Sequence, residues 1–476
     1  MKSKVLIKRA IIIVILIAIS VVGICAFWHV QKQNRMKKDF MARIATETYD
    51  SVFFSMYSIE NYSVEDFEEY RNVTPILSTY KINSLSEMSE CLKAAFESPN
   101  IIENVYLGLD TEVMWKDAGE NTDKWIQSLS QDLGTLFVEY PGVSFDILLS
   151  YPELDYWTKM NQEQLSTNTA NITTFTIALS PFSNVNVYFP GMEEWLIANP
   201  ANYNDQFITT PDISQKLIRF VFCDQRHRID AEDIYEKLEV FEEYVTSQKE
   251  NPTKYQDLSD WNIVFFGDSI IGNYKGSLSI PGVVNGLSKA RVYNYGVGGT
   301  PAGHLLERVA DFANQSIGET RDKGVFPYDE VNTSGENLCF VIHYGLNDYF
   351  GGASVDNPSD AYDTNTYAGC LRSGIKQLQQ NYPNAKIILM PPPFTITFTN
   401  GTEIKSPVGG VLVDYVDAAI SVAEEMQVDC LESYYALGMN EDNEHIYLAD
   451  GCHYNEYGRY LTGIRTIRML ESEENN

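Results

Sequence analysis

Short apolar runs alternate with amphipathic stretches over the C-terminal half of the chain. Five runs are rich in residues that favour strands, and they span 262–266, 291–295, 338–342, 386–390 and 428–431. Between and after them, apolar residues recur at helical spacing over 366–381, 410–427 and 455–470. Strands that alternate with helices in this way form a parallel sheet covered by helices on both faces. We therefore predict an α/β domain with a parallel sheet over residues 261–472.

A second pattern lies near the N-terminus, where residues 10–28 (AIIIVILIAISVVGICAFW) carry no charge. At ~1.5 Å per residue, a helix of this length crosses the hydrocarbon core of a bilayer. A cleaved signal peptide is the alternative, but the run is longer than the apolar part of most signal peptides, and Phe27-Trp28 and further basic residues follow it. We predict a transmembrane signal anchor, with residues 1–9 in the cytoplasm and the body of the chain outside.

The stretch between the anchor and the C-terminal domain divides into three parts. Residues 29–44 form a juxtamembrane segment, and 45–228 form a first globular region. Over 229–260 we predict a helical connector, because Asp230 opens a stretch with four apolar residues at helical spacing: Ile234, Leu238, Phe241 and Val245. A polar segment that begins at Asn251-Pro252 then leads into the C-terminal domain.

The net charge and the spacing of the cysteines bear on two questions: whether the protein binds nucleic acid and whether it binds a metal. The formal net charge is -30 although the first forty residues are basic, so the body of the protein is strongly acidic. Such a surface repels the phosphates of nucleic acids, which excludes a nucleic-acid partner. The seven cysteines include no Cys-x-x-Cys pair and no Cys/His cluster, so we predict no metal site.

Four polar motifs follow the predicted strands or precede the last helix. In chain order they are Gly267-Asp268-Ser269-Ile270, the glycine-rich stretch Asn294–Thr300, Gly345-Leu346-Asn347-Asp348, and Asp450-Gly451-Cys452-His453. In an open parallel sheet, catalytic groups gather at the carboxyl ends of the strands. We therefore expect these motifs to meet at one edge of the sheet.

The residue types in these motifs are those of nucleophilic catalysis. Asp450 can accept a hydrogen bond from one ring nitrogen of His453, which leaves the other nitrogen to face Ser269. The glycine-rich stretch and Asn347 can donate to a developing oxyanion. Taken alone, each motif has an ordinary structural explanation, and Asp450 with His453 would also fit a helix cap or half a metal site. Together and in this order, they predict a serine hydrolase that uses neither a metal nor another cofactor.

The four motifs resemble those of the SGNH/GDSL-like serine esterase/lipase superfamily over about residues 259–472. The resemblance implies a flavodoxin-like, three-layer α/β/α fold and hydrolysis of esters. It also implies roles for five residues: Ser269 as nucleophile, Asp450 and His453 as the other members of the triad, and Gly299 and Asn347 as oxyanion donors together with the amide of Ser269. Gly296 and Gly298 compete with Gly299 for its role.

The first globular region repeats part of this pattern in the same order. The segments that correspond in sequence are Val105–Asp110 with Ile342–Asn347, Tyr140–Pro152 with Tyr382–Pro391, Asn184–Tyr188 with Val428–Leu431, and Asp205 with Asp450. No histidine stands three residues after Asp205, and no Gly-Asp-Ser motif opens the region. We predict that 45–228 is a second α/β domain, a degenerate copy with an accessory or substrate-presenting role.

Three functions from different classes fit these observations. The leading hypothesis is a membrane-anchored, extracytoplasmic esterase that removes acyl groups, such as acetyl, from a cell-surface glycan; the family resemblance suggests the acyl group and the glycan. An O-acyltransferase on the same Ser-His-Asp scaffold would use a sugar hydroxyl in place of water. A non-catalytic glycan-binding or assembly protein would carry broken catalytic motifs, which 45–228 has and 261–472 does not.

Overall fold

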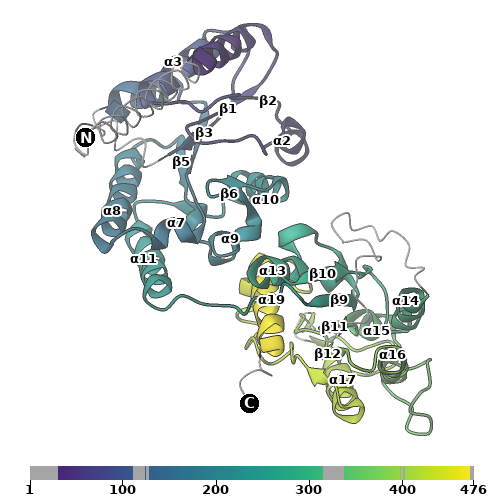
Figure 1. Ribbon diagram of the computed structural model, residues 1–476. Helices are drawn as coiled ribbons and strands as arrows, with labels where there is room; N and C mark the ends of the chain where they lie inside the picture. Colours follow the sequence, from purple (N-terminus) through teal and green to yellow (C-terminus); the bar gives the residue numbers. More distant parts are fainter. Residues whose placement is uncertain are drawn as a thin grey trace, which may run out of the picture. The chain divides into compact units, whose positions relative to one another are not determined.

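The computed structural model describes residues 31–110, 124, 128–314, 337–396, 398–399 and 402–471. They form two compact units (Figure 1). Unit 1 holds the described residues up to Glu193 together with Asp205–Glu250, and unit 2 holds Glu194–Asn204 and the described residues from Asn251 onward. The predicted membrane span, residues 10–28, lies outside the described residues. Of the helices in the described part, none is long and apolar enough to cross a membrane.

Unit 2 is built on a parallel sheet of five strands with the order β10-β9-β11-β12-β15. This confirms the predicted α/β domain with a parallel sheet. The strands lie where the apolar runs predicted them, at β9 (Asn262–Gly267), β10 (Arg291–Asn294), β11 (Leu338–His343), β12 (Lys386–Met390) and β15 (Asp429–Cys430). Every residue of β9 and β11 is buried, because central strands of a parallel sheet are covered on both faces.

Two layers of helices cover this sheet (Figure 1). On one face α13 (Ile280–Ser288) packs against α19 (Glu456–Glu471), and on the other α16 (Tyr367–Asn381) contacts both α14 (Gly303–Ala313) and α17 (Leu412–Met426). The helices predicted over 366–381, 410–427 and 455–470 are α16, α17 and α19. Two short helices, α12 (Ser269–Gly272) and α15 (Leu346–Gly351), begin at the carboxyl ends of β9 and β11. These two helices carry candidate site residues.

Unit 1 contains a six-stranded sheet with the order β2-β1-β3-β4-β5-β8. Its strands are β1 (Ser51–Ser55), β2 (Pro75–Leu77), β3 (Asn104–Leu109), β4 (Ser144–Leu149), β5 (Val185–Tyr188) and β8 (Arg228–Ile229), of which only β8 runs antiparallel to its neighbour. When the strands within each of the two large sheets are numbered in chain order, the first five follow the order 2-1-3-4-5 in both sheets. This strand order is common to doubly wound α/β sheets, so unit 1 is a second α/β unit and its origin as a degenerate copy stays a prediction.

The counterpart of the serine motif in unit 1 carries different chemistry. Strand β1 ends at Ser55 and β9 ends at Gly267, and each pairs with the third strand of its sheet at that position. Two residues further on stand Tyr57 in unit 1 and Ser269 in unit 2. The Tyr57 side chain is buried and donates to the carbonyl of Leu148 at 3.3 Å. Unit 1 therefore holds a packed phenol where unit 2 holds a serine.

The division into units differs from the predicted boundaries at three places. Residues 31–46 are helical, and Phe40 packs edge-on against Phe54 in unit 1, so the described part of the predicted juxtamembrane segment belongs to that unit. The predicted connector supplies α11 (Ile234–Glu250), whose Phe241 contacts Trp157 in the same unit. Residues 194–204, predicted within the first region, group with unit 2. Apolar packing, which the local pattern does not reveal, decides the first two.

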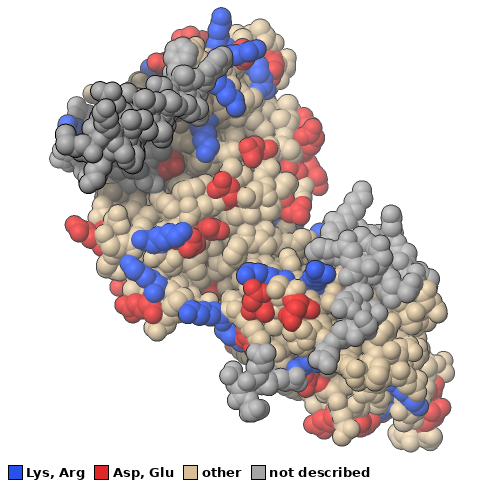
Figure 2. Space-filling view, in the orientation of Figure 1, with Lys and Arg blue, Asp and Glu red and all other residues tan. Residues whose placement is uncertain are grey.

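The charges of the described residues are distributed over both units. On the face that Figure 2 shows, acidic side chains lie on each unit with lysines and arginines among them.

Candidate active site

Ser269 stands at the carboxyl end of β9, at the first position of α12. The chain turns at Asp268, whose buried carboxylate accepts from the amide of Ile270 at 3.0 Å and so caps the short helix. Gly267 is required just before this turn, because a side-chain carbon there would lie 2.9 Å from the carbonyl oxygen of His343. The Ser269 side chain remains partly exposed at the edge of the sheet.

His453 and Asp450 reach the same edge from the loop before α19. The Nε2 atom of His453 lies 3.0 Å from Oγ of Ser269, and its Nδ1 atom lies 2.8 Å from Oδ2 of Asp450. Ser269 and His453 are 184 positions apart in the chain, so only the fold brings them together. The three side chains form a continuous line of hydrogen bonds in the order that proton transfer from a serine requires.

The turn from Asp450 to His453 is built to present the carboxylate to the imidazole. The other carboxylate oxygen of Asp450 accepts from the backbone amides of Cys452 at 3.0 Å and His453 at 2.8 Å. Partial burial acts to raise the pKa of Asp450, but these amides and the His453 ring outweigh it and hold the pKa below its ordinary value. Gly451 has a φ of 77°, the left-handed conformation that favours glycine. Asp450 is therefore ionised at neutral pH.

The predicted oxyanion donors lie on two neighbouring segments. Asn347 is on α15, and its Nδ2 atom donates to the carbonyl of Thr300 at 3.2 Å and, at 3.4 Å, to Asp268. Asn347 is thus placed between the glycine-rich loop and the serine turn. Gly299 is exposed at the tip of this loop with a φ of 79°, so the backbone conformation favours glycine there.

Of the competing glycines, Gly298 lies nearest to Ser269. A side-chain carbon at Gly298 would come within 3.7 Å of Cβ of Ser269 and within 2.7 Å of Oδ1 of Asn273. A carbon at Gly296 would instead collide with Ile271 and Gly272 of α12, so this glycine allows the loop to pack on the helix. The assignment of Gly299 as an oxyanion donor stays a prediction.

Beneath these groups lies a buried polar cluster. Asp268, His343 and Asp348 are each at most 3% exposed. Nδ1 of His343 lies 3.4 Å from Oδ1 of Asp268, which makes His343 a buried neighbour of the serine turn rather than a second base in contact with Ser269. Tyr344 and Tyr349 beside them are also buried, whereas Phe350 is 45% exposed.

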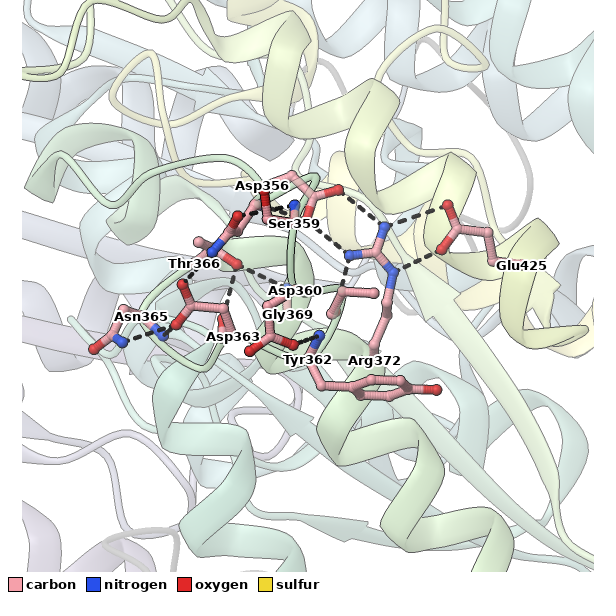
Figure 3. Close-up of polar contacts among 12 residues, drawn as sticks. Asp356, Ser359, Asp360, Tyr362, Asp363, Asn365, Thr366, Gly369, Arg372 and Glu425 are labelled. Atoms are coloured by element: carbon pink, nitrogen blue, oxygen red, sulfur yellow. Dashed lines mark hydrogen bonds and ion pairs between the residues drawn. The ribbon is translucent and has the colours of Figure 1, made fainter.

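The segment that follows Asn347 is fixed by Arg372 of α16 (Figure 3). Its guanidinium binds both oxygens of Asp356 on that segment, at 2.8 and 3.0 Å, and both oxygens of Glu425 on α17, at 2.6 and 3.3 Å. Paired fork geometry of this kind holds planar groups in a fixed orientation. The loop between α15 and α16 is therefore tied to two helices of unit 2.

Sequence reasoning gave no role to two residues that shape the site, Thr395 and Asp348, although Asp348 stands in the third motif. Thr395, in the loop after β12, is 1% exposed and donates through its hydroxyl to the carbonyl of Gly451 at 2.9 Å, next to the triad. Asp348 follows Asn347 directly and binds the backbone beyond the glycine-rich loop. A position just after a predicted strand was the available signal for Thr395. For Asp348 the signal was an acidic residue within an otherwise apolar stretch.

Comparisons with known proteins agree with this arrangement. Residues 265–460 match the family described as the GDSL-like Lipase/Acylhydrolase family, and this range contains all four motifs. No curated protein matches the chain.

Solved structures with some likeness cover less than half of the chain. A protein from Lactobacillus plantarum is 18% identical, with a TM-score of 0.36, over 46% of this chain and 99% of its own. The lipase/acylhydrolase from Enterococcus faecalis is 21% identical, with a TM-score of 0.30, over 44% of this chain and 95% of its own. The aryl esterase of M. smegmatis is 14% identical, with a TM-score of 0.29, over 44% of this chain and 99% of its own.

The family assignment rests on the sequence match and on the residues within it. The matched range holds a serine at the end of the first strand, a glycine-rich loop, the Gly-Leu-Asn-Asp motif and the Asp–His turn. Residues 265–460 therefore form a domain of the GDSL-like lipase/acylhydrolase kind, and the chain is a serine ester hydrolase.

Proposed function

We propose that this chain is a membrane-anchored, extracytoplasmic serine esterase that removes small acyl groups, such as acetyl, from a cell-surface glycan. The observation that carries the proposal is the line of hydrogen bonds from Ser269 through His453 to Asp450. The uncharged run over residues 10–28 supports the anchor, and the proposed orientation places the long acidic body outside, because long domains translocate largely regardless of their charge.

In the proposed reaction, Oγ of Ser269 attacks the carbonyl carbon of the ester while Nε2 of His453 takes its proton. Asp450 accepts from Nδ1 and stabilises the imidazolium that forms. His453 then gives the proton to the departing sugar oxygen, which leaves an acyl group on Ser269. Water repeats the sequence on the acyl-enzyme, with His453 again as base, and releases the carboxylic acid.

Negative charge develops on the carbonyl oxygen in both steps, and three donors are assigned to it. They are the backbone amides of Ser269 and Gly299 and the side-chain amide of Asn347. The contact between Asn347 and Asp268 is long, at 3.4 Å, so this is the hydrogen bond that an oxyanion would replace.

The accessibility of the site supports a large substrate. The Asp450 side chain is 57% exposed and that of His453 is 26% exposed. Gly298 and Gly299, on the neighbouring loop, are exposed as well. An acyl group that projects from a polymer can approach such a site without the polymer entering the protein.

Hydrolysis by the full chain in detergent micelles, with p-nitrophenyl acetate as substrate, tests the nucleophile. Ser269→Ala should abolish turnover while thermal unfolding stays unchanged, because only a partly exposed hydroxyl is lost. Ser359→Ala is the matched control, since its side chain lies on an exposed part of the loop in Figure 3, and it should retain wild-type turnover. Full turnover in the Ser269 variant would exclude the assigned nucleophile.

The substrate class requires a second experiment, with an O-acetylated polysaccharide and with an acceptor sugar present or absent. Release of free acetate at a rate independent of the acceptor supports the esterase. Acetyl groups recovered on the acceptor would instead identify a transferase, and no release from any glycan would reject this substrate class.

Protease treatment tests the location of the protein. Protease added to intact cells or protoplasts should degrade the body of the chain while its N-terminal part remains with the membrane. A body that is protected until the membrane is broken would reverse the proposed topology.

A further inference from the structure

The glycine-rich loop leads into helix α14, which has no cap of its own. Ala302 occupies the N-cap position, and no side chain within the helix's own start accepts from its first amides. The carboxylate of Asp348, from α15, lies there instead: the backbone amide of Ala302 is 2.9 Å from Oδ2 and 3.1 Å from Oδ1. A carboxylate is favourable at a helix N-terminus, because the first amides are unpaired and the helix dipole is positive there.

The same loop is held at its other positions by the serine turn and by Asn347. The amide of Val297 donates to the carbonyl of Gly267 at 2.8 Å. The carbonyl of Thr300 accepts from Asn347 at 3.2 Å, and its hydroxyl donates to the carbonyl of Val297 at 2.7 Å. Among these hydrogen bonds on either side of Gly299, the one from the Ala302 amide is accepted by a buried carboxylate, and the others are accepted by backbone carbonyls.

We propose that Asp348 is a positioning residue for the oxyanion hole: its ionised carboxylate caps α14 at Ala302 and thereby holds the glycine-rich loop against Ser269 and Asn347. The proposal rests on the proposed esterase mechanism, in which this loop supplies one donor. Asp348 acts through the backbone and does not itself contact the reacting atoms.

The surroundings of Asp348 make its charge sensitive to pH. Burial raises its pKa to about 7, the Ala302 amide opposes that rise, and the nearby charge of Asp268 adds to it. The other ionisable groups that interact electrostatically with Asp348 are Tyr344, Tyr367, Cys370 and Tyr415, and Arg308 of α14 interacts with Tyr344. Burial raises the pKa of each of these tyrosines and of the thiol. Of these side chains, Asp348 is therefore the one expected to change charge near neutral pH.

The first test compares hydrolysis by wild type and Asp348→Asn from pH 5.5 to 8.5. The amide keeps the shape of the side chain and an acceptor oxygen but carries no charge, so kcat should fall about tenfold at pH 8.5 with little change in KM. At pH 5.5 the wild-type carboxylate is itself protonated, so the ratio of the two rates should approach one.

Asp417→Asn is the matched control, because it makes the same change of charge at an exposed position of α17, and its ratio to wild type should stay near one at every pH. A purely structural role for Asp348 would lower the rate by the same factor throughout. A ratio of the wild-type rate to the Asp348→Asn rate that does not change with pH would therefore overturn the proposal.

The second test is independent of catalysis and measures amide hydrogen exchange in peptides that cover residues 297–305. Asp348→Ala should accelerate exchange there about tenfold relative to wild type, while peptides from β9 and β11 keep their protection. If the Ala variant does not fold, Asp348→Asn replaces it, with a smaller acceleration expected. Unchanged exchange would overturn the proposal whether or not the protein hydrolyses esters, whereas faster exchange in a protein without esterase activity would reject only the proposed function.

Discussion

Replacement of Asp450 by asparagine separates the charge of the triad carboxylate from its structural role. One oxygen of Asp450 accepts two backbone amides of the turn, and an asparagine oxygen can keep both hydrogen bonds. The atom that faces Nδ1 of His453, 2.8 Å away in the wild type, then becomes an amide nitrogen, which donates and so favours the imidazole tautomer with its proton on Nε2. The turn should therefore survive, while the imidazolium loses its counter-ion.

The expected loss follows from the exposure of the two side chains. Unit charges about 4 Å apart interact by about 1 kcal/mol in water and about 4 kcal/mol at the lower effective dielectric typical of a protein surface. Because the Asp450 side chain is 57% exposed and His453 is 26% exposed, solvent screens the pair substantially. The lost charge contributes about 2 kcal/mol, which corresponds to a loss in kcat of roughly 30-fold, and the wrong tautomer of His453 adds to that loss.

The assay is the initial rate of p-nitrophenyl acetate hydrolysis at pH 8 by wild type, Asp450→Asn and His453→Gln. The histidine variant should lose far more activity than Asp450→Asn, because no base remains to take the serine proton. The pKa of Asp450 lies below its ordinary value, so its carboxylate stays ionised as the pH falls to 6, and the loss on substitution should persist there. If Asp450→Asn is as inactive as His453→Gln, the carboxylate does more than stabilise charge; if it is fully active, Asp450 is not part of the triad.

Three further predictions concern other parts of unit 2. Asn347→Ala should lower kcat by roughly 10²–10³, the usual effect of losing one oxyanion donor; a change in KM alone would contradict that role. Arg372→Ala should lower the free energy of unfolding by about 1–3 kcal/mol in denaturant titrations, because Asp356 and Glu425 lose a shared partner. The loss stays in this range because both carboxylates are partly exposed. An unchanged midpoint would show that the hydrogen bonds in Figure 3 make no net contribution to stability. EDTA should leave hydrolysis unchanged, since Ser269 supplies the nucleophile, and loss of activity that a divalent metal restores would make Asp450 and His453 metal ligands.

The local pattern of the sequence determined the architecture of unit 2. All five strands were predicted within one or two residues, because a strand buried on both faces must be a short, continuous apolar run between polar turns. The clustering of the candidate site residues could be predicted for a related reason. Ser269, Asn347, Asp450 and His453 lie in short motifs at the ends of these elements, where the chain itself fixes their position along the sheet edge.

The tertiary structure decided what depends on contacts between distant segments. Helix α11 would be amphipathic both as a connector and as a part of unit 1. Its packing against Trp157 shows that it belongs to unit 1. The closeness of Gly298 to Ser269 depends on how a loop folds over α12, which spacing along the chain does not encode. The capping of Ala302 by Asp348, 46 positions away, is a contact of the same kind. Periodicity records which face of an element is buried, whereas the partner of a buried polar group is set by the three-dimensional packing.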